Sequence, residues 1–448
     1  MKKKWWSIPL VCLMVFALFL SGCNSDEGST KETPEGDGLK GTLKVQILGD
    51  IKLDDATNPT TGKRSKGLHV IRDEFQKLHP EAKIEFINVP WDNYVPKTQA
   101  MISSGEADVY QMPGITDFAS QGLLEPLEPF IEKDKFDLGV YIDNQMDGWK
   151  TMGPDDEELK TYGLPVFGDT RFIYFDKKLF DDWGVEYLSE NPTLEEIAEK
   201  AKKMTGKNPK TGEENYGVYF MGNHSTLFTL LNAVEGQNAT WGSGFKFKDM
   251  KFQFNSPEME KGLNWLLDLK QYAPKGLVSA QGSEKWLTKD NNIAIMLNQG
   301  PDGKLDFAEK LDGRLGIVDE FKNSEGVGGM FAGSPFAIAK NSKNKELAWE
   351  FLKFTSSDFY QKFMWEEHGV LPVVKSSLEW DSVKNSPLTT AAIKTLATPI
   401  APRYPWASSQ PRFILQSKIE GALTGDLTAK EALEQAQTES EDWLETKK

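Results

Sequence analysis

The sequence predicts an α/β fold divided between two domains. Strand-like and helix-like patterns alternate as β-α-β-α-β over residues 41–112, which is typical of a sheet covered by helices on both faces. The same alternation returns over residues 193–448. After its polar N-terminal stretch the 448-residue chain still has about 410 residues, which is more than one hydrophobic core usually serves.

The first five elements follow from the spacing of apolar residues. Residues 41–48 alternate as a strand, and the apolar residues of 68–78 recur at helical spacing until a proline ends the helix. Residues 82–89 alternate again as a second strand. A helix that tolerates its proline near the start covers residues 96–105, and residues 107–112 form the third strand.

Helix-capping residues mark the later elements. Thr193 and Glu196 have the spacing of a capping box, and so do Thr428 and Glu431 at the start of the last helix. Ser256 precedes a proline at the first position of another expected helix. The remaining expected elements are strands at 292–297 and 334–340 and a helix around 347–354.

The N-terminus has the three parts of a secretory signal peptide. Lysines occupy positions 2 to 4, residues 8–20 are apolar, and two small residues precede Cys23. The apolar run is too short to span a bilayer, which takes about 20 helical residues. We therefore expect residues 1–22 to be removed, and an uncleaved anchor is the weaker interpretation.

The residues Leu20-Ser21-Gly22-Cys23 resemble the lipobox of bacterial lipoproteins. That resemblance implies cleavage before Cys23 and lipidation of its thiol, whereas the alternative is an ordinary signal peptide with an incidental cysteine. Residues 24–40 are polar and have no apolar period, so they cannot bury enough surface to fold. We expect residues 23–40 to be a lipidated cysteine followed by a flexible tether.

Composition excludes several classes of function. A net charge of −15 is unfavourable for binding nucleic acid, which requires clustered lysine and arginine. The two cysteines, at positions 12 and 23, leave the mature body without a disulfide or a catalytic thiol. The four histidines are scattered without metal-ligand spacing and no P-loop motif occurs, so we expect no metal site and no cofactor.

Several segments in a fixed order resemble one protein family. The chain is similar, from Gly41 to its C-terminus, to the extracellular solute-binding lipoproteins of carbohydrate ABC importers, and in particular to their maltose-binding-like branch. The segments that carry the resemblance are "FQKLHPEAKIEFINVPWDNYVPKTQAMISSGEADVYQM", "QGLLEPLEPFI", "YGLPVFGDTRFIYFDKKLFDDWGV", "PTLEEIAEKAKKMT", "NIAIMLNQG", "NKELAWEFLKFTSS", "HGVLPV" and "LTGDLTAKEALEQA".

The resemblance implies a two-lobed, periplasmic-binding-protein-like fold with a cleft between the lobes and a hinge that the chain crosses several times. Lobe one would comprise residues 41–168 and 328–372, and lobe two residues 172–327 and 373–448. The expected crossings are Gly168–Arg171, Val327–Phe331 and Leu371–Val374.

Glycines support one of these crossings. Gly326, Gly328 and Gly329 are permissive residues of the kind that hinges often use, although a surface turn would explain them equally well. A ligand held in the cleft would favour the closed arrangement of the lobes.

Polar candidates for sugar binding lie at predicted strand ends and at the first crossing. The resemblance implies that Asp169 binds sugar hydroxyls there, with Arg171 either donating to the ligand or pairing with Asp169. Asp50 follows the first strand and Asp117 follows the third, where ligands bind in open α/β sheets. For Asp169 the alternative is a solvated acidic residue in a loop.

A sugar site also needs aromatic side chains that stack on the apolar sugar faces. The loop after the third strand carries Gln111 and Met112 where the maltose-binding-like branch has an aromatic residue, which argues against maltose itself. Trp241, Trp286 and Trp406 lie in predicted loops and are the aromatic candidates.

Other candidates and expected core residues complete this set. Trp265 and Trp349 fall within apolar helical patterns and are expected in the core. His224, Asn298 and Met330 complete the ligand-binding candidates.

These observations favour a non-enzymatic sugar receptor, monomeric and lipid-anchored on the outer face of the cell membrane, with an ABC permease as its partner. The same fold could instead bind a peptide, a polyol or an osmolyte, while acidic residues around the cleft would repel an anion. A surface glycoside hydrolase would need two carboxylates in one cleft, such as Asp50 and Asp169, and no local pattern supports it. An adhesion or sensor lipoprotein of the same fold also remains open.

Overall fold

The structure is a computed structural model that describes residues 39–49, 51–57, 64–91, 94–220, 224–279, 281–300, 313–328, 333–399, 404–405 and 410–447. The expected signal peptide, Cys23 and the tether lie outside the described residues. Within these ranges the chain forms two mixed five-stranded sheets, so the predicted α/β, two-lobed fold is confirmed. No helix among the described residues is long and apolar enough to cross a membrane.

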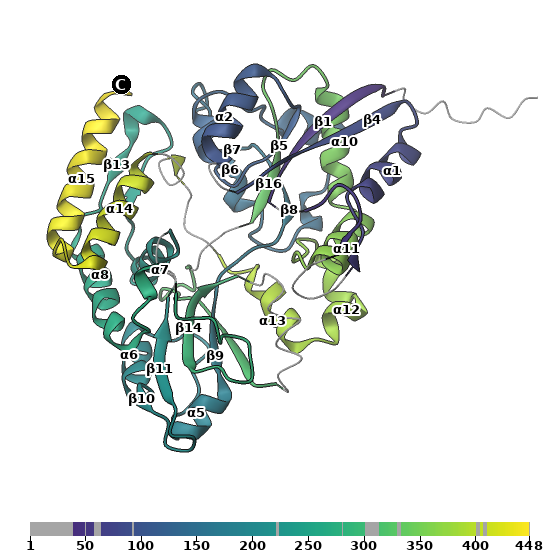
Figure 1. Ribbon diagram of the computed structural model, residues 1–448. Coiled ribbons are helices and arrows are strands. Elements are labelled where there is room, and N and C mark those ends of the chain that lie inside the picture. Colours follow the sequence, from purple (N-terminus) through teal and green to yellow (C-terminus); the bar gives the residue numbers. More distant parts are fainter. Residues whose placement is uncertain are drawn as a thin grey trace, which may run out of the picture. The chain divides into compact units, whose positions relative to one another are not determined.

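In the first sheet β4, β1, β5 and β8 run in one direction and β16 runs in the opposite one (Figure 1). Its order is β4-β1-β5-β16-β8. β1 is parallel to both β4 and β5, while β16 is antiparallel to β5 and to β8. The strands are β1 (Gly41–Leu48), β4 (Ala82–Val89), β5 (Val109–Gln111), β8 (Leu164–Phe167) and β16 (Ser334–Ile338).

Alternate side chains of each strand point to opposite faces of the first sheet, and helices pack against both of these faces. Val45 and Ile47 of β1 belong to a core cluster that includes Phe75 from α1 and Phe351 from α10. Tyr110 of β5 belongs to another cluster, with side chains from α2 and α3. The helices of this part are α1 (His69–Leu78), α2 (Tyr94–Ser104), α3 (Ile115–Ser120), α4 (Glu128–Asp134), α10 (Lys345–Thr355) and α11 (Asp358–His368).

The second sheet has the order β10-β11-β14-β9-β15. β11 and β14 are parallel, and β9 is antiparallel to both of its neighbours, β14 and β15. Its strands are β9 (Phe172–Asp176), β10 (Gly206–Lys207), β11 (Glu214–Tyr219), β14 (Ile293–Gln299) and β15 (Leu315–Asp319). The apolar strand expected at 292–297 is β14, the sheet's central strand, and every one of its residues is buried.

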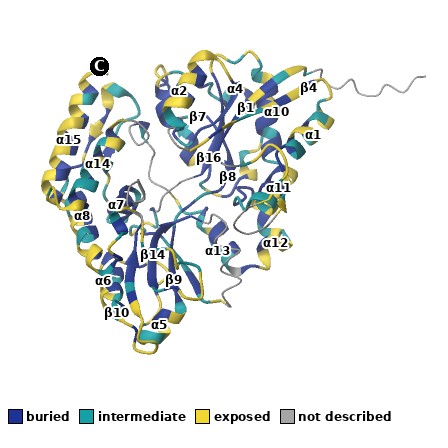
Figure 2. Cartoon of the chain, viewed as in Figure 1, coloured by how far each residue is buried: buried dark blue, intermediate teal, exposed yellow. Residues whose placement is uncertain are grey.

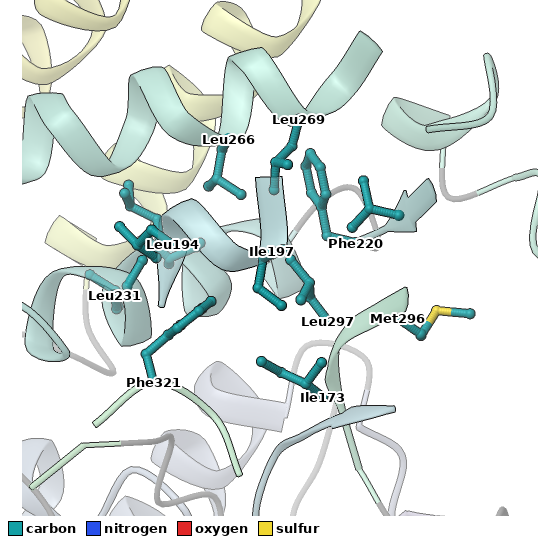
Figure 3. Close-up of a cluster of buried hydrophobic side chains, with 14 of the residues drawn as sticks. Ile173, Leu194, Ile197, Phe220, Leu231, Leu266, Leu269, Met296, Leu297 and Phe321 are labelled. Atoms are coloured by element: carbon teal, nitrogen blue, oxygen red, sulfur yellow. The ribbon is translucent and has the colours of Figure 1, made fainter. Parts of the chain in front are cut away.

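Helices cover the second sheet and form one large apolar core with it. Figure 3 shows part of this core, in which side chains of α6, α7 and α8 meet those of the strands. In Figure 2 the strands are mostly buried and the exposed residues lie mainly on the outward faces of the helices. These helices are α5 (Lys177–Trp183), α6 (Leu194–Lys203), α7 (His224–Glu235), α8 (Pro257–Leu269), α13 (Pro387–Thr395), α14 (Gln410–Thr424) and α15 (Ala429–Glu445).

Short elements complete the described part of the chain. They are the strands β2 (Ala56–Thr57), β3 (Arg64–Ser65), β6 (Lys150–Thr151), β7 (Lys160–Thr161), β12 (Gly242–Ser243) and β13 (Lys251–Phe252) and the helix α12 (Asp381–Lys384).

One of the two expected capping boxes is complete. Thr428 and Glu431 cap α15 reciprocally, as the sequence predicts. Thr193 caps α6 by accepting a hydrogen bond from the backbone N–H of Glu196. The Glu196 side chain, however, accepts from Ser189 and Lys200 instead of reaching back to Thr193. The prediction was therefore half right, because a lysine one turn along the helix competes for the carboxylate.

In the described residues the chain passes between the two parts at least three times, the third time after α11, since α13, α14 and α15 pack against the second core. It leaves the first sheet after β8 and enters the second at β9, and it returns between β15 and β16. Gly168 lies at the first passage and pairs with Leu371, whose carbonyl accepts its N–H at 2.8 Å. A Cβ atom on Gly168 would lie 2.7 Å from the Leu396 side chain and 2.9 Å from the Leu371 carbonyl oxygen, so the segments pack too closely for another residue.

Candidate functional site

The carboxyl ends of β4, β1 and β5 lie at the same edge of the first sheet, because the three strands are parallel. The end of β8 and the start of β16 lie at this edge too, since Phe167 pairs with Ser334. Ligands of open α/β sheets bind beyond this edge. Trp91 and Tyr94 follow β4, and Asp117 follows β5.

The second sheet has a corresponding edge. Phe172, the first residue of β9, pairs with Gln299 at the end of β14 and with Asp319 at the end of β15. The residues next to these three positions therefore lie together. They are Asp169 and Arg171 before β9, Asn298 in β14 and Glu320 after β15.

Asp169 and Arg171 form an ion pair at the first passage between the sheets. The Nη1 atom of Arg171 donates to Oδ1 of Asp169 at 2.6 Å and to the carbonyl oxygen of Thr170 at 3.1 Å. The two side chains are 31% and 21% exposed, so both remain partly accessible to a solute. Of the two roles that the sequence left open for Arg171, pairing with Asp169 is present in the structure.

Glu320 is a buried carboxyl group behind this ion pair. Its Oε1 accepts a hydrogen bond from the backbone N–H of Asn298 at 2.7 Å, and its Oε2 accepts from Nδ2 of Asn232 at 3.3 Å. Burial raises the pKa of Glu320 to about 7, although these hydrogen bonds and the positive charge of Arg171 lower it. Glu320 therefore titrates near neutral pH.

Asp117 is the second buried carboxyl group at these edges. It lies in the first turn of α3 and accepts a hydrogen bond from Nε2 of Gln121 at 3.3 Å. Burial raises the pKa of Asp117 to about 6, against the hydrogen bond from Gln121 and the positive charge of Lys447. An acid of this kind can act as a hydrogen-bond donor or acceptor for a hydroxyl group near neutral pH.

Trp91 is a half-exposed aromatic residue at the edge of the first sheet. Its ring makes an edge contact with Tyr94, with 5.6 Å between the ring centroids. It also covers Gly49, where an added Cβ atom would lie 2.5 Å from the Trp91 indole nitrogen. The indole is thus held beside the end of β1 with an exposed surface that suits a sugar ring.

Arg412 of α14 faces Tyr94. Burial shifts the pKa of Tyr94 upward and that of Arg412 downward, while the electrostatic interaction between the two side chains opposes each shift. The guanidinium carbon lies 5.0 Å from the Phe228 ring centroid and 5.3 Å from that of Phe413. Its Nε atom is buried and has no partner among the described residues.

The sequence analysis missed Trp91, Tyr94, Arg412 and Glu320. Trp91 had a usable signal, because it follows the strand 82–89 just as Asp50 follows the first strand. Arg412 and Glu320 had none, since only the folded chain brings them to these edges.

A sequence profile of the bacterial extracellular solute-binding protein family matches residues 62–362. This match covers more than half of the chain. The chain belongs to that family. The family resemblance noted in the sequence is thereby confirmed, and members of this family are solute-binding receptors and not enzymes.

Similar proteins support this assignment. The galactooligosaccharide-binding protein of Bacillus subtilis is 24% identical over 456 residues, which cover 96% of this chain and 95% of that protein. The sugar-binding protein MalE of Xanthomonas citri has the same fold, with a TM-score of 0.72 and 20% identity over 91% of this chain and 98% of its own. An ABC substrate-binding protein from Listeria monocytogenes, solved in complex with cycloalternan, has a TM-score of 0.68 and 21% identity to this chain. The match covers 89% of this chain and 98% of that protein.

The other aromatic candidates lie in or against the large apolar core of the second sheet. Trp241 is 5% exposed, stacks on Phe254 with 6.3 Å between centroids, and donates from its indole nitrogen to Glu235 at 3.3 Å. Trp286 is partly buried against the same core. Packing accounts for Trp241 without a ligand, and the ligand roles of both residues stay predictions. Trp349 is buried and Trp265 is partly buried against a core, as the sequence indicated.

Several site candidates of the solute-binding protein cannot be placed. Asp50, Trp406, Met330 and the lipidation candidate Cys23 lie outside the described residues. His224 is the first residue of α7, but the position of its side chain is not described. Their roles stay predictions.

Two further features define what this part of the receptor can hold. In the ranges that the structure describes, no group of three or more acidic, histidine or cysteine residues could bind a metal ion. A cavity of about 510 Å³ lies between β15 and α13, and of the edge residues above only Asp319 lines it. It is therefore distinct from the Asp169–Arg171 pair.

Proposed function

We propose that this protein captures a sugar or oligosaccharide in a cleft between its two lobes and delivers it to the permease of an ABC importer. Lobe one would comprise residues 41–168 and 328–372, and lobe two residues 172–327 and 373–448. The ligand-binding set would comprise Asp169, Arg171 and Asp117 from the sequence prediction, joined by Trp91 and Arg412.

The observation that carries this proposal is the chemistry gathered at the carboxyl edges of the two sheets. Asp169 and Arg171 offer an acceptor and a donor that are partly exposed, and Trp91 offers an exposed aromatic face. A sugar presents paired hydroxyl groups around apolar C–H faces, so it matches this combination. The acidic groups Asp117 and Asp169 make an anionic solute unfavourable.

The names of similar proteins favour the same class of solute. A galactooligosaccharide-binding protein, a sugar-binding protein and a cycloalternan complex are among the proteins with this fold. Their identities to this chain are low, so they favour carbohydrate without specifying which one.

A thermal-shift screen tests the proposed solute class. The protein is heated with mono- and oligosaccharides, and with peptides, polyols and betaines as controls. A solute at 100 times its Kd adds about 2.7 kcal/mol to the free energy of unfolding, which gives a clear rise in Tm. A rise with one sugar class supports the proposal, whereas a rise only with a control solute overturns it.

We further propose that a lipid on Cys23 anchors the protein to the extracellular face of the cell membrane. The lipobox residues support this, because two or more acyl chains hold a protein firmly at a bilayer. Replacing Cys23 by alanine should move the protein from the membrane fraction to the medium. Retention of the variant in the membrane would contradict lipid anchoring.

A further inference from the structure

Glu320 is a buried carboxyl group, which is unusual for an acidic residue. It is 1% exposed, directly follows β15, and has no hydrogen-bonded lysine or arginine among the described residues. Its two oxygens accept from Asn298 and Asn232. A buried acid without an ion-pair partner is costly, so its position invites a functional explanation.

The hydrogen bond from the backbone N–H of Asn298 to Glu320 stabilises an unfavourable backbone conformation at Asn298. Asn298 has a φ of +52°, in the left-handed region that residues other than glycine rarely adopt. The pairing of β14 with β9 also shifts register between Met296 and Gln299. The N–H of Asn298 is held by Oε1 of Glu320 at 2.7 Å, so Glu320 stabilises this turn at the end of the strand.

The charged groups around Glu320 belong to the proposed binding site and its borders. The positive charge of Arg171 acts on Glu320, and Arg171 also pairs with Asp169. Asp319 is the nearest negative charge and is itself paired with Lys322. Arg171 thus interacts with two carboxyl groups, one exposed in part and one buried behind it.

We propose that Glu320 is a positioning residue: its carboxylate fixes the turn at Asn298 and balances the charge of Arg171, and this makes solute affinity depend on pH. The inference rests on the proposed function and concerns the regulation of that same site. Glu320 itself is too buried to touch the solute.

The sign of the effect follows from the hydrogen bonds. An ionised Glu320 accepts at both oxygens, and its charge strengthens the bond from Asn298. A protonated Glu320 has one oxygen that must donate, which conflicts with the N–H group of Asn232, and it no longer balances the charge of Arg171. Solute affinity should therefore fall as the medium becomes acidic.

The test measures the Kd of the sugar found in the screen, by calorimetry on the full-length protein, from pH 8 to pH 5.5. Because charge-assisted hydrogen bonds are about twice as strong as neutral ones, wild-type affinity should fall about three- to tenfold over this range. Glu320→Gln, which imitates the neutral acid, should bind weakly at pH 8 and show no fall between pH 8 and pH 6.5.

One variant serves as a control. Asp176→Asn alters another buried acid at the opposite end of β9, where it pairs with Arg314, and should keep the wild-type pH profile. A profile that Asp176→Asn abolishes, or that Glu320→Gln leaves unchanged, would overturn the proposal.

A readout without solute separates this inference from the proposed function. The backbone amide of Asn298, followed by NMR, should titrate near neutral pH in the wild type and stay constant in Glu320→Gln. If no sugar binds, the proposed function fails and the Asn298 titration still decides whether Glu320 controls this turn. An Asn298 amide that is independent of pH overturns the inference.

Discussion

Asp169 offers the most direct test of the binding site. The structure pairs its carboxylate with Arg171 at 2.6 Å and leaves about a third of the side chain exposed. A partly exposed pair of this kind contributes about 0–1 kcal/mol to folding, because solvent screens it. Replacing Asp169 by alanine should therefore leave the Tm nearly unchanged.

The expected effect on binding is larger than the effect on folding. A hydrogen bond from a sugar hydroxyl to a charged carboxylate is worth about 1.5–3 kcal/mol, and 1.4 kcal/mol corresponds to a tenfold change in Kd. Asp169→Ala should thus weaken sugar binding at least tenfold. Loss of the Arg171 partner adds to this, since the guanidinium can then turn away from the solute.

Calorimetric titration with the sugar measures this loss. Asp182→Ala is a matched control, because Asp182 also pairs with a basic residue, Lys178 at 2.5 Å, but lies on α5, which follows the opposite end of β9 from Asp169. The control should bind as the wild type does. An Asp169→Ala variant that folds and binds with unchanged Kd would refute the assignment of the passage between β8 and β9 to the binding site.

Three further predictions concern other parts of the molecule. Trp91→Ala should weaken sugar binding by about 1–2 kcal/mol, and it should leave the Tm unchanged because the ring is already half exposed. As a control, Phe359→Ala removes a similarly exposed ring from α11 and should bind the sugar normally in the same titration. Asp117→Asn should raise the free energy of unfolding at pH 7 by up to about 3 kcal/mol and leave it unchanged at pH 3.5. The pKa of Asp117 is higher in the folded chain than in the unfolded chain, so the protonated acid favours folding at low pH and this contribution is lost as the pH rises through about 6. Urea denaturation at both pH values would detect the difference. Gly168→Ala should lower the free energy of unfolding by about 1–3 kcal/mol, because its Cβ would crowd the Leu371 carbonyl oxygen; an unchanged urea midpoint would contradict this.

The elements of the fold were predictable where local patterns decide them. The strand at 41–48 has the predicted bounds, although alternation is typical of a strand with one exposed face and residues 45–48 are all buried. The helix predicted at 68–78 begins one residue later, at His69. The capping box at Thr193 was only half right, because the partner that Glu196 chooses depends on side chains that a local pattern does not weigh.

The proposed binding site could be predicted from the sequence only where it follows a strand end. Asp117 and Asp169 were found by that rule or by family resemblance, and Trp91 could have been found in the same way. Arg412 could not, because its position beside Tyr94 joins α14 to α2, two helices far apart in sequence. Glu320 could not either, since one acid among many in the sequence shows no sign of being buried.

The end of β15 gives a physical route from the proposed site to the passages between the sheets. Successive residues of a strand point to opposite faces, so Asp319 and Glu320 reach different surroundings. Asp319 accepts a hydrogen bond from Thr395 of α13, while Glu320 holds Asn298. Just beyond α13, the Leu396 carbonyl oxygen accepts from the Gln145 side chain at 2.7 Å.

This route connects segments that a change of lobe arrangement would have to move. The Leu396 side chain also packs against Gly168, where there is no room for a larger residue. Gly168 directly precedes Asp169 in the segment between β8 and β9. A displacement of Glu320 on protonation would shift Asp319 with it, since the two are adjacent in the chain. The hydrogen bond from Thr395 to Asp319 would then carry the shift to α13 and towards Leu396.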